Sequence, residues 1–317
     1  MTRRPILVTG THRSGTTWVG DMLALSPLAH YVHEPLAPMN RRTWLRDPVP
    51  TQYIHLPPGS QSDLAEDLRA IAGLHPPWSR MVARTGDPKH VVRVTQQALA
   101  AWRARRSGAR AVIKDPFALL SAEWISDTSG ADVVVLVRHP AAFVSSVCRL
   151  GWRLDPRHLL DQPSLVVGPL SDHLADLEAD LRTPGDMVEH GCVVWRALNA
   201  VVRDYARRRP EWTVTPYEDL AGDPVHAYEG LFERLGLPWD GPTARRIGDR
   251  NAPRHGAEVA SDSKGSTARD SRRAMWTWTD RLDPADVDRI RERTWDVARH
   301  WYADDEWWPA GSTEVTP

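Results

Sequence analysis

The chain begins with a short apolar strand, a glycine-containing loop and the start of a helix, a combination that binds phosphate groups. Residues 6–8 predict the strand, and Thr16 begins an amphipathic helix. Gly10 and Gly15 have the spacing of a phosphate-binding loop, but Thr16 stands where that loop has its lysine, and Arg13 carries the positive charge instead. Backbone N–H groups at the helix start still cradle an anion. The loop therefore predicts a different activated donor from an ordinary nucleoside triphosphate.

A second candidate anion site follows the apolar run at residues 133–137, which predicts another strand. Arg138 ends this strand, Pro140 suits the first turn of a helix, and Ser146 lies about two turns into that helix. A guanidinium and a hydroxyl at these positions suit a phosphate group distinct from the one at the first loop. Alone, Arg138 more often closes a surface salt bridge and Ser146 is a packing residue. Only the combination with the first loop favours a ligand site.

Two proton-accepting side chains, His33 and Glu34, lie in a run that predicts the end of a further strand. Alternation along that strand places their side chains on opposite faces. Either side chain could act as a general base, and the alternative for Glu34 is an acidic residue that only pairs with an arginine. Lys114 follows the predicted strand at residues 111–113, at the edge where open α/β sheets bind ligands. Asp115, by contrast, is explained as a helix cap.

Strand and helix patterns alternate along the chain and predict a parallel α/β fold. Continuous apolar or β-branched runs predict core strands at residues 6–8, 111–113, 133–137 and 212–214. Together with the segment that carries Glu34, they predict a central sheet of about four to five strands flanked by helices. Long helices are expected from Met187 to Tyr205 and from Val287 to Trp301, the second opened by Asp283 and Pro284.

The 317 residues are expected to form a single domain. A stretch rich in Pro, Trp and Arg, at about residues 36–90, predicts an insertion on the substrate side of the sheet. A polar, Arg-rich stretch at about residues 241–275 predicts a mobile loop that caps the donor.

The composition excludes several classes of protein. A formal net charge of −1 argues against a dedicated nucleic-acid or anionic-membrane binder, so any basic site must be local. Cys148 and Cys192 lack metal-ligand spacing and are expected to be reduced thiols of a cytoplasmic protein. The first motif starts at residue 5, so neither a signal peptide nor a membrane anchor is expected before it. The longest apolar run, residues 131–137, is too short to span a bilayer.

The two anion-binding motifs resemble those of the sulfotransferase family, which uses 3′-phosphoadenosine 5′-phosphosulfate (PAPS). The resemblance is carried by Thr11-His-Arg-Ser-Gly-Thr-Thr-Trp18 and by Arg138-His-Pro followed, after five residues, by Ser146. Tyr217-Glu-Asp-Leu220 and Lys264-Gly265 are similar to later segments of the family, and Tyr-Glu-Pro-Leu segments of carbohydrate sulfotransferases resemble the run around Glu34. The resemblance implies the P-loop-nucleotide-hydrolase-like fold of that family.

The same resemblance implies a role for each matched residue. The 5′-phosphosulfate would be held by Arg13, Ser14, Gly15, Thr16 and Thr17, the 3′-phosphate by Arg138, Ser146, Lys264 and Gly265, and adenine would lie against Trp18 and Tyr217. Lys114 would act with Arg13 on the charge that develops at the sulfuryl group and the leaving phosphate. Pro116 stands where some members have a histidine base. Other members use a glutamate base, so the resemblance favours Glu34 for that role, with His33 as the second choice.

The implied reaction is transfer of a sulfuryl group from PAPS to a hydroxyl of a small-molecule, glycolipid or other glycoconjugate acceptor. No metal is expected, because the fixed cations suffice and the sequence has no acidic cluster of recognised ligand spacing. Neither a nucleic-acid partner nor stable membrane insertion is expected, and the oligomeric state stays open. A P-loop kinase is an alternative that Thr16 and His139-Pro140 argue against. A non-catalytic nucleotide-binding protein of the same fold is the other alternative.

Overall fold

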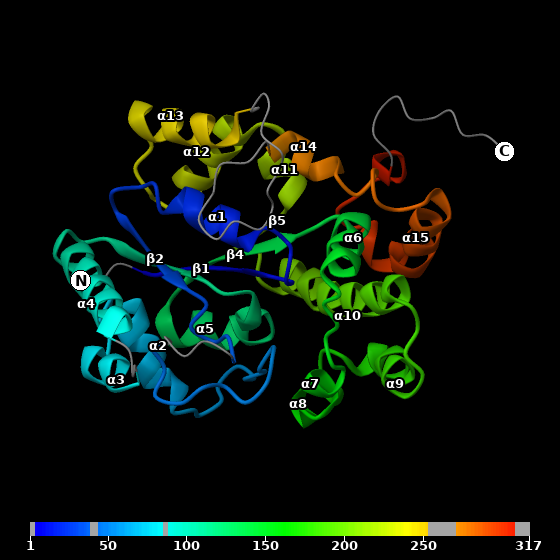
Figure 1. The fold of residues 1–317 in the computed structure, drawn as a ribbon, viewed down its shortest axis with the longest axis horizontal. Helices are drawn as coiled ribbons and strands as arrows, with labels where there is room; N and C mark the ends of the chain where they lie inside the picture. Colours follow the sequence, from blue (N-terminus) through cyan, green and yellow to red (C-terminus); the bar gives the residue numbers. More distant parts are fainter. Residues whose placement is uncertain (1–3, 39–43, 85–87, 253–270, 308–317) are drawn as a thin grey trace. The chain divides into compact units, whose positions relative to one another are not determined.

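The computed structural model describes residues 4–38, 44–84, 88–252 and 271–307, without the side chain of His90. Five strands form one sheet in the order β2-β3-β1-β4-β5 (Figure 1). The strands are β1 Ile6–Gly10, β2 Ala29–His33, β3 Arg110–Lys114, β4 Asp132–Val137 and β5 Thr213–Pro216. Both β1 and β2 pair in parallel with β3, so that Lys114 lies opposite Val8 on one side and His33 on the other. The expected parallel α/β fold with a central sheet is confirmed.

Helices connect the strands. Before β4 they are α1 Thr16–Leu23, α2 Leu64–Ala72, α3 Trp78–Ala83, α4 Pro88–Arg106, the 3₁₀ helix η1 Pro116–Ser121 and α5 Ala122–Ser129. After β4 they are α6 Pro140–Leu150, α7 Arg157–Leu160, α8 Pro163–Val166, η2 Ser171–His173, α9 Leu174–Arg182, α10 Met187–Arg208, α11 Tyr217–Gly222, α12 Pro224–Arg234, α13 Gly241–Asn251, α14 Ser271–Trp276, α15 Pro284–Ala298 and η3 Asp304–Trp307. The predicted helices that begin at Thr16, Met187 and Pro284 are present, although α15 ends before Trp301.

The chain forms two compact units. The first unit comprises Met1–His12, Thr16–Val135 and Tyr228–Ile247. The second unit comprises Arg13–Gly15, Leu136–Ala227 and Gly248–Pro317. The expectation of a single domain with a substrate-side insertion stays a prediction.

The core of the first unit is built on β1 and β3, whose residues are all buried, as expected for strands covered on both faces. Helix α1 packs against both strands. A Cβ on Gly20 of α1 would lie 2.7 Å from Cε2 of Tyr31 and 3.1 Å from Cβ of Lys114. The helix therefore approaches the sheet this closely because residue 20 has no side chain.

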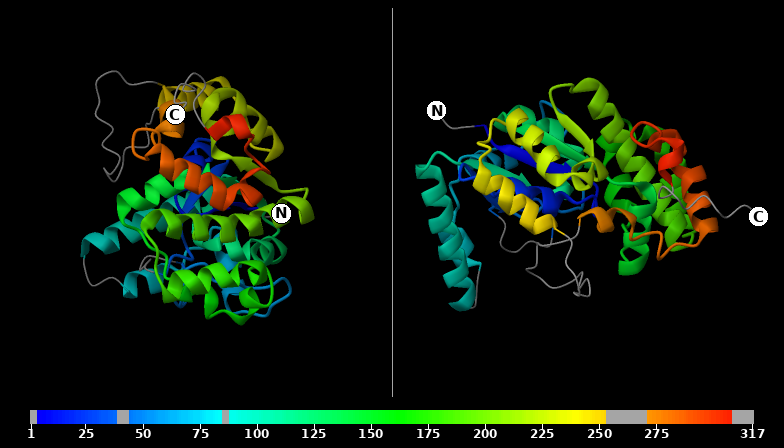
Figure 2. Two further views of the ribbon diagram at one scale, coloured as in Figure 1. Left: turned by 90° about the vertical axis from the view of Figure 1, so that its right-hand side faces the viewer. Right: turned by 90° about the horizontal axis from the view of Figure 1, so that it is seen from above.

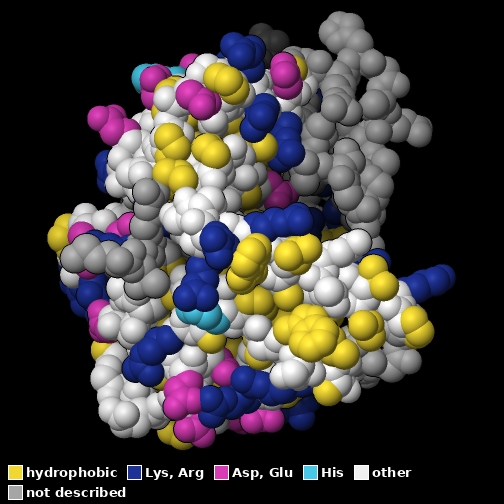
Figure 3. Space-filling view, turned by 90° about the vertical axis from the view of Figure 1, so that its left-hand side faces the viewer, with side chains coloured by type: hydrophobic (Ala, Val, Ile, Leu, Met, Phe, Trp, Pro, Cys, Tyr) yellow, Lys and Arg dark blue, Asp and Glu magenta, His cyan; other side chains and the backbone are white. Residues whose placement is uncertain are grey.

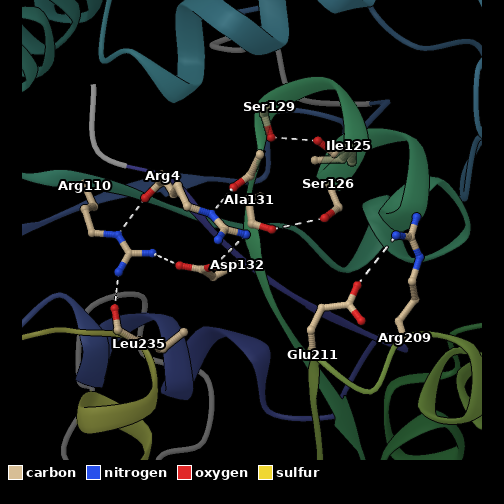
Figure 4. A network of polar contacts seen from close by, with 11 residues as sticks. Arg4, Arg110, Ile125, Ser126, Ser129, Ala131, Asp132, Arg209, Glu211 and Leu235 are labelled. Atoms are coloured by element: carbon tan, nitrogen blue, oxygen red, sulfur yellow. Dashed lines mark hydrogen bonds and ion pairs between the residues drawn. The ribbon is translucent and has the colours of Figure 1, made fainter. Parts of the chain in front are cut away.

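A buried arginine joins the amino ends of the strands in the first unit (Figure 4). Arg110, the first residue of β3, donates to the carbonyl of Arg4 at 2.6 Å and also to the carbonyl of Leu235. It pairs with Asp132 of β4, which in turn lies 3.0 Å from the guanidinium of Arg4. A carboxylate and two carbonyls thus satisfy the buried guanidinium. The opposite edge of the sheet, where the strands end, is the edge at which such folds bind ligands.

In the second unit, α6, α10 and α15 pack against one another (Figures 1 and 2). Asp186 caps α10, because its side chain accepts a hydrogen bond from the backbone N–H of Glu189 at 2.8 Å. The predicted apolar stripe of α10 is buried, including Val194, Leu198 and Val201. Helix α6 begins with Pro140, two residues after Arg138, as the sequence predicts.

Helices lie in both the predicted insertion and the predicted loop. The expected insertion at residues 36–90 includes α2, α3 and the start of α4, and the expected loop at residues 241–275 includes α13 and α14. The sequence pattern does not predict α13, because the helix is strongly polar and Ile247 is its one large apolar side chain in the core. Residues 253–270 lie outside the described residues, so the predicted mobility and capping role of this segment stay untested.

Candidate functional site

The loop between β1 and α1 has backbone angles that favour glycine. Gly15 has a φ of 95°, and Arg13 has a φ of 66°, in the left-handed region. Within the second unit, a Cβ on residue 15 would lie 2.4 Å from Cδ2 of Tyr217. Residue 15 must therefore be glycine for two reasons, its backbone conformation and the ring of Tyr217 packed on it. Tyr217 contacts the loop as a result, while its role beside adenine stays a prediction.

Arg13 and Ser146, one from each sequence motif, contact each other in the second unit. The Nε of Arg13 donates a hydrogen bond to Oγ of Ser146 at 2.9 Å. Arg13 is exposed and Ser146, on α6, is half-buried. A guanidinium and a hydroxyl that meet at an accessible position offer several donors to an anion. The two motifs, far apart in the sequence, thus supply adjacent groups.

Arg138, the other member of the second motif, is buried and is already engaged by protein groups. Its guanidinium lies 3.9 Å from the centroid of the Tyr217 ring, and its Nε lies 3.2 Å from Oε1 of Glu218. It also donates to the carbonyl of Ala274 at 2.8 Å. The salt bridge that the sequence leaves open for Arg138 is therefore present, but it is buried rather than on the surface.

Glu218 is a positioning residue that the sequence does not single out. Its carboxylate accepts hydrogen bonds from the hydroxyl of Tyr302 at 2.9 Å and from the backbone N–H of His139 at 3.3 Å. Burial raises the pKa of Glu218, while the charge of Arg138 acts in the opposite direction. Because a buried guanidinium requires a counter-charge, Glu218 fixes the orientation of Arg138. Its only signal in the sequence is that it follows Tyr217.

His139, between Arg138 and Pro140, lies in an aromatic cluster. Its ring stacks on Trp278 with centroids 5.3 Å apart and an interplanar angle of 9°, and Tyr302 and Trp307 meet it edge-on. Neither ring nitrogen has a hydrogen-bond partner among the described residues. Burial, followed by the charge of Arg138, lowers the pKa of His139 to about 3. The imidazole is therefore neutral at pH 7, and Arg138 alone provides the charge of this motif.

In the first unit, Glu34 and Lys114 form an ion pair at the carboxyl ends of β2 and β3. Nζ of Lys114 donates to Oε1 of Glu34, and the backbone N–H of Glu34 donates to the carbonyl of Lys114 at 2.8 Å. Lys114 is fully buried, whereas the Glu34 side chain is 25% exposed. Burial acts to raise the pKa of Glu34, but Lys114, with smaller contributions from His33 and His12, holds it below its usual value. Glu34 is therefore an ionised carboxylate that solvent can reach.

The side chains of His33 and Glu34 lie close together, so the expectation that they point to opposite faces is wrong. Nε2 of His33 is 3.7 Å from Oε2 of Glu34. The physical reason is that β2 ends at His33 and Glu34 turns out of the strand with a φ of 41°. Burial and then Lys114 lower the pKa of His33, although Glu34 opposes this. Both groups are therefore proton acceptors at neutral pH, and the choice between them stays a prediction.

Asp115 has the predicted role of a helix cap and a second role as well. Its Oδ1 accepts from the backbone N–H of Phe117 at 2.9 Å, at the start of η1. Its Oδ2 accepts from the backbone N–H of Leu36 at 2.6 Å. Burial raises the pKa of this carboxyl to about 7. Asp115 thus anchors the turn that follows Glu34, which makes it a positioning residue for the candidate base.

His12 and Tyr53 are further residues at this site that the sequence does not single out. The hydroxyl of Tyr53 accepts from the backbone N–H of His12 at 2.9 Å and lies 2.6 Å from its Nδ1. Phe117 meets the imidazole edge-on, with centroids 4.2 Å apart. Tyr53, fully buried, therefore fixes the imidazole in one orientation, at the position before Arg13. The sequence shows a histidine in the loop, but its position there does not by itself indicate a role.

The remaining loop residues divide between core and surface. Ser14 and Thr16 are buried, and Thr17 is exposed. Trp18 is 7% exposed and meets the ring of Tyr228 edge-on, with centroids 5.4 Å apart. Trp18 is thus a core residue of α1, and its role beside adenine stays a prediction. Lys264 and Gly265 lie outside the described residues, and their predicted contact with the 3′-phosphate stays a prediction.

In the described part of the chain, no three His, Cys, Asp or Glu side chains gather as a metal site would require. Within the same residues, no helix combines the length and the apolar character needed to cross a bilayer.

Comparison with known proteins identifies one family. The model of a sulfotransferase family matches residues 5–241. No curated protein matches the chain. The sulfotransferase domain from the curacin biosynthetic pathway is 16% identical, with a TM-score of 0.46, and the similarity covers 92% of this chain and 98% of that one. Sulfotransferase STF1 from Mycobacterium tuberculosis H37Rv is 18% identical, with a TM-score of 0.40 and coverage of 93% and 77%. Mouse sulfotransferase SULT7A1, complexed with PAP, is 14% identical, with a TM-score of 0.39 and coverage of 96% and 86%.

Proposed function

Because the chain belongs to the sulfotransferase family, we propose that it transfers the sulfuryl group of PAPS to a hydroxyl of a small-molecule or glycoconjugate acceptor. The products are a sulfate ester and adenosine 3′,5′-bisphosphate. The observation that carries this proposal is the hydrogen bond between Arg13 and Ser146, which joins the two motifs at an accessible position. The proposed setting is the cytoplasm, with no nucleic-acid partner.

Donor binding is assigned to the second unit. Arg13 and the loop N–H groups would hold the 5′-phosphosulfate, and Ser146 with Arg138 would hold the 3′-phosphate. The groups present suit a doubly anionic nucleotide, because the second unit supplies two guanidinium groups, Arg13 beside Ser146 and Arg138 over the ring of Tyr217. Arg138 is pre-oriented by Glu218 and keeps donors for a ligand, since a guanidinium has five N–H groups.

Acceptor activation is assigned to the first unit. The acceptor oxygen attacks sulfur, a new O–S bond forms, and its proton passes to Glu34. The bond between sulfur and the bridging oxygen breaks, and its electron pair stays on the leaving phosphate. Lys114 has three N–H groups, so it can pair with Glu34 and also stabilise charge on the sulfuryl oxygens. These fixed cations perform the task without Mg²⁺.

Adenosine 3′,5′-bisphosphate is expected to raise the melting temperature more than AMP or ATP does, without magnesium. The reason is that two separate anion-binding groups, at Arg13 and at Arg138, match two phosphates on different carbons. At about 100 times its Kd, the ligand stabilises the fold by roughly 2.7 kcal/mol. Differential scanning fluorimetry measures this. Equal or greater stabilisation by ATP with Mg²⁺ would favour a P-loop kinase, and bisphosphate binding without transfer to any hydroxylated acceptor would favour a non-catalytic binding protein.

Ser146→Ala should weaken binding of adenosine 3′,5′-bisphosphate by about tenfold, because it removes a hydrogen bond to a charged group. Affinity for AMP, which lacks the 3′-phosphate, should stay unchanged. Ser145→Ala is the matched control: Ser145 precedes Ser146 on α6, and its buried hydroxyl has no hydrogen-bond partner among the described residues. Isothermal titration calorimetry measures both affinities. An equal loss for AMP would show that Ser146 acts on the first loop through Arg13 instead of on the 3′-phosphate.

A further inference from the structure

The outward face of α4 carries an exposed apolar stripe. Val92 is 57% exposed, Leu99 44% and Trp102 49%, and Trp78 at the start of α3 is 48% exposed. Positions 92, 95, 99 and 102 alternate steps of three and four residues, so they lie along one line of the helix. Trp78 joins the same line, because its Nε1 donates to Oγ1 of Thr95 at 3.1 Å. Apolar side chains gather over this part of the first unit in Figure 3.

The stripe is separate from the face by which α4 packs on its own unit. Val94 and Ala101 are buried, and they lie on a different side of the helix from the exposed stripe. Helix α4 contacts α3 and β2. The helix thus has two apolar faces, of which one packs on the fold and the other is presented to solvent. Exposed apolar residues that gather on one surface mark an interaction site more often than scattered ones do.

Helix α4 is also strongly basic. Between Pro88 and Arg106 it carries Lys89, Arg93, Arg103, Arg105 and Arg106 and no Asp or Glu, in a chain whose formal net charge is −1. These basic side chains are exposed. Several of them flank the apolar stripe, and the guanidinium of Arg106 lies 5.0 Å from the centroid of the Trp102 ring. A surface that combines apolar side chains with flanking cations fits a partner that is apolar in its interior and anionic at its rim.

We propose that α4, together with Trp78, docks the protein on an anionic lipid surface. The apolar stripe would enter the headgroup region, and the arginines beside it would pair with lipid phosphates and carboxylates. A second copy of the protein is a less suitable partner for this surface, because two basic α4 helices would bring like charges together. The exposed apolar area comes from four side chains, whereas a stable protein interface uses about 20–30 residues a side. Docking of this kind is peripheral and does not depend on the proposed sulfuryl transfer.

Vesicle co-sedimentation of the full chain tests the proposal. The protein should sediment with vesicles of phosphatidylcholine and phosphatidylserine, and not with phosphatidylcholine alone. Binding should fall at high salt, because screening weakens the electrostatic part. Arg103→Glu with Arg105→Glu should lower the partition coefficient at least about tenfold. Leu99→Glu with Trp102→Glu should abolish binding, and circular dichroism verifies that both variants fold.

Val167→Glu is the matched control, since Val167 is an apolar residue that is 83% exposed but lies on a different segment, after α8. It should bind vesicles like the unchanged protein. Equal binding to neutral vesicles, or binding that survives both α4 variants, would overturn the proposal. A third result would also overturn it: no vesicle binding, together with a dimer in light scattering that Leu99→Glu dissociates. The partner of the α4 surface would then be a second copy of the protein.

Discussion

Glu34→Gln should lower turnover by roughly 10²–10⁴-fold, the usual size of a general-base contribution, and should leave nucleotide affinity unchanged. The amide is nearly isosteric, and its oxygen still accepts from Nζ of Lys114, so the ion pair becomes a hydrogen bond and the packing persists. What is lost is the ability to take the proton of the acceptor hydroxyl. Transfer from radiolabelled PAPS to a panel of hydroxylated acceptors measures turnover, and calorimetry with adenosine 3′,5′-bisphosphate measures binding.

His33→Ala is the control for this prediction, because His33 is the neighbouring proton acceptor and its side chain is 58% exposed. It should cost much less turnover than Glu34→Gln. Near-normal turnover in Glu34→Gln with collapse in His33→Ala would reverse the assignment. If both variants kept full activity, the base would be a different residue, and the fixed imidazole of His12 would be the next to test.

The strands and the principal helices follow from the sequence because their burial pattern is simple. Residues of β1 and β3 are buried on both faces, so a continuous apolar run is enough to predict them. The stripe of α10 has a period of 3.6 because one face packs on α6 and α15. Helix α4 does not show this period, since Val92 and Leu99 on its outer face are apolar like the buried Val94. A helix with two apolar faces has no clear periodicity.

The site was predictable where it depends on strand ends and unpredictable where it depends on long-range pairing. The sequence predicts that Glu34 and Lys114 lie at strand ends, and the register observed between β2 and β3, which places His33 opposite Lys114, then brings the two side chains together. The pairing of Arg138 with Glu218 could not be predicted, because no local sequence pattern relates Glu218 to a residue 80 positions earlier. Likewise, Tyr53 reaches His12 from a segment without regular structure. Contacts of this kind are set by tertiary packing.

Lys114→Met should lower turnover by about 10²–10³-fold, the cost of removing one fixed group that stabilises charge in the transition state. It should also move the acid limb of the pH profile of kcat/KM to higher pH. As the proposed base, Glu34 would act only when ionised, so activity should fall as the pH drops through its pKa, which Lys114 holds below the usual 4.5. Without that cation, burial, the largest single influence, is opposed only by His33 and His12, and the pKa of Glu34 rises. Lys114→Met should therefore lose activity at mildly acidic pH values at which the unchanged protein is still active.

Methionine is chosen for this substitution because it removes the charge of Lys114 and keeps a side chain of similar length. The side chain of Lys114 is fully buried, and its Cβ and Cγ lie against Gly20 of α1, so an apolar chain of similar length keeps this packing. Profiles of kcat/KM from about pH 4 to pH 8 for the unchanged protein and Lys114→Met measure the shift, since this ratio reports groups of the free enzyme. Adding Glu34→Gln should remove the acid limb altogether. An acid limb that stays in place in Lys114→Met would mean that the titrating base is not the carboxylate paired with this lysine.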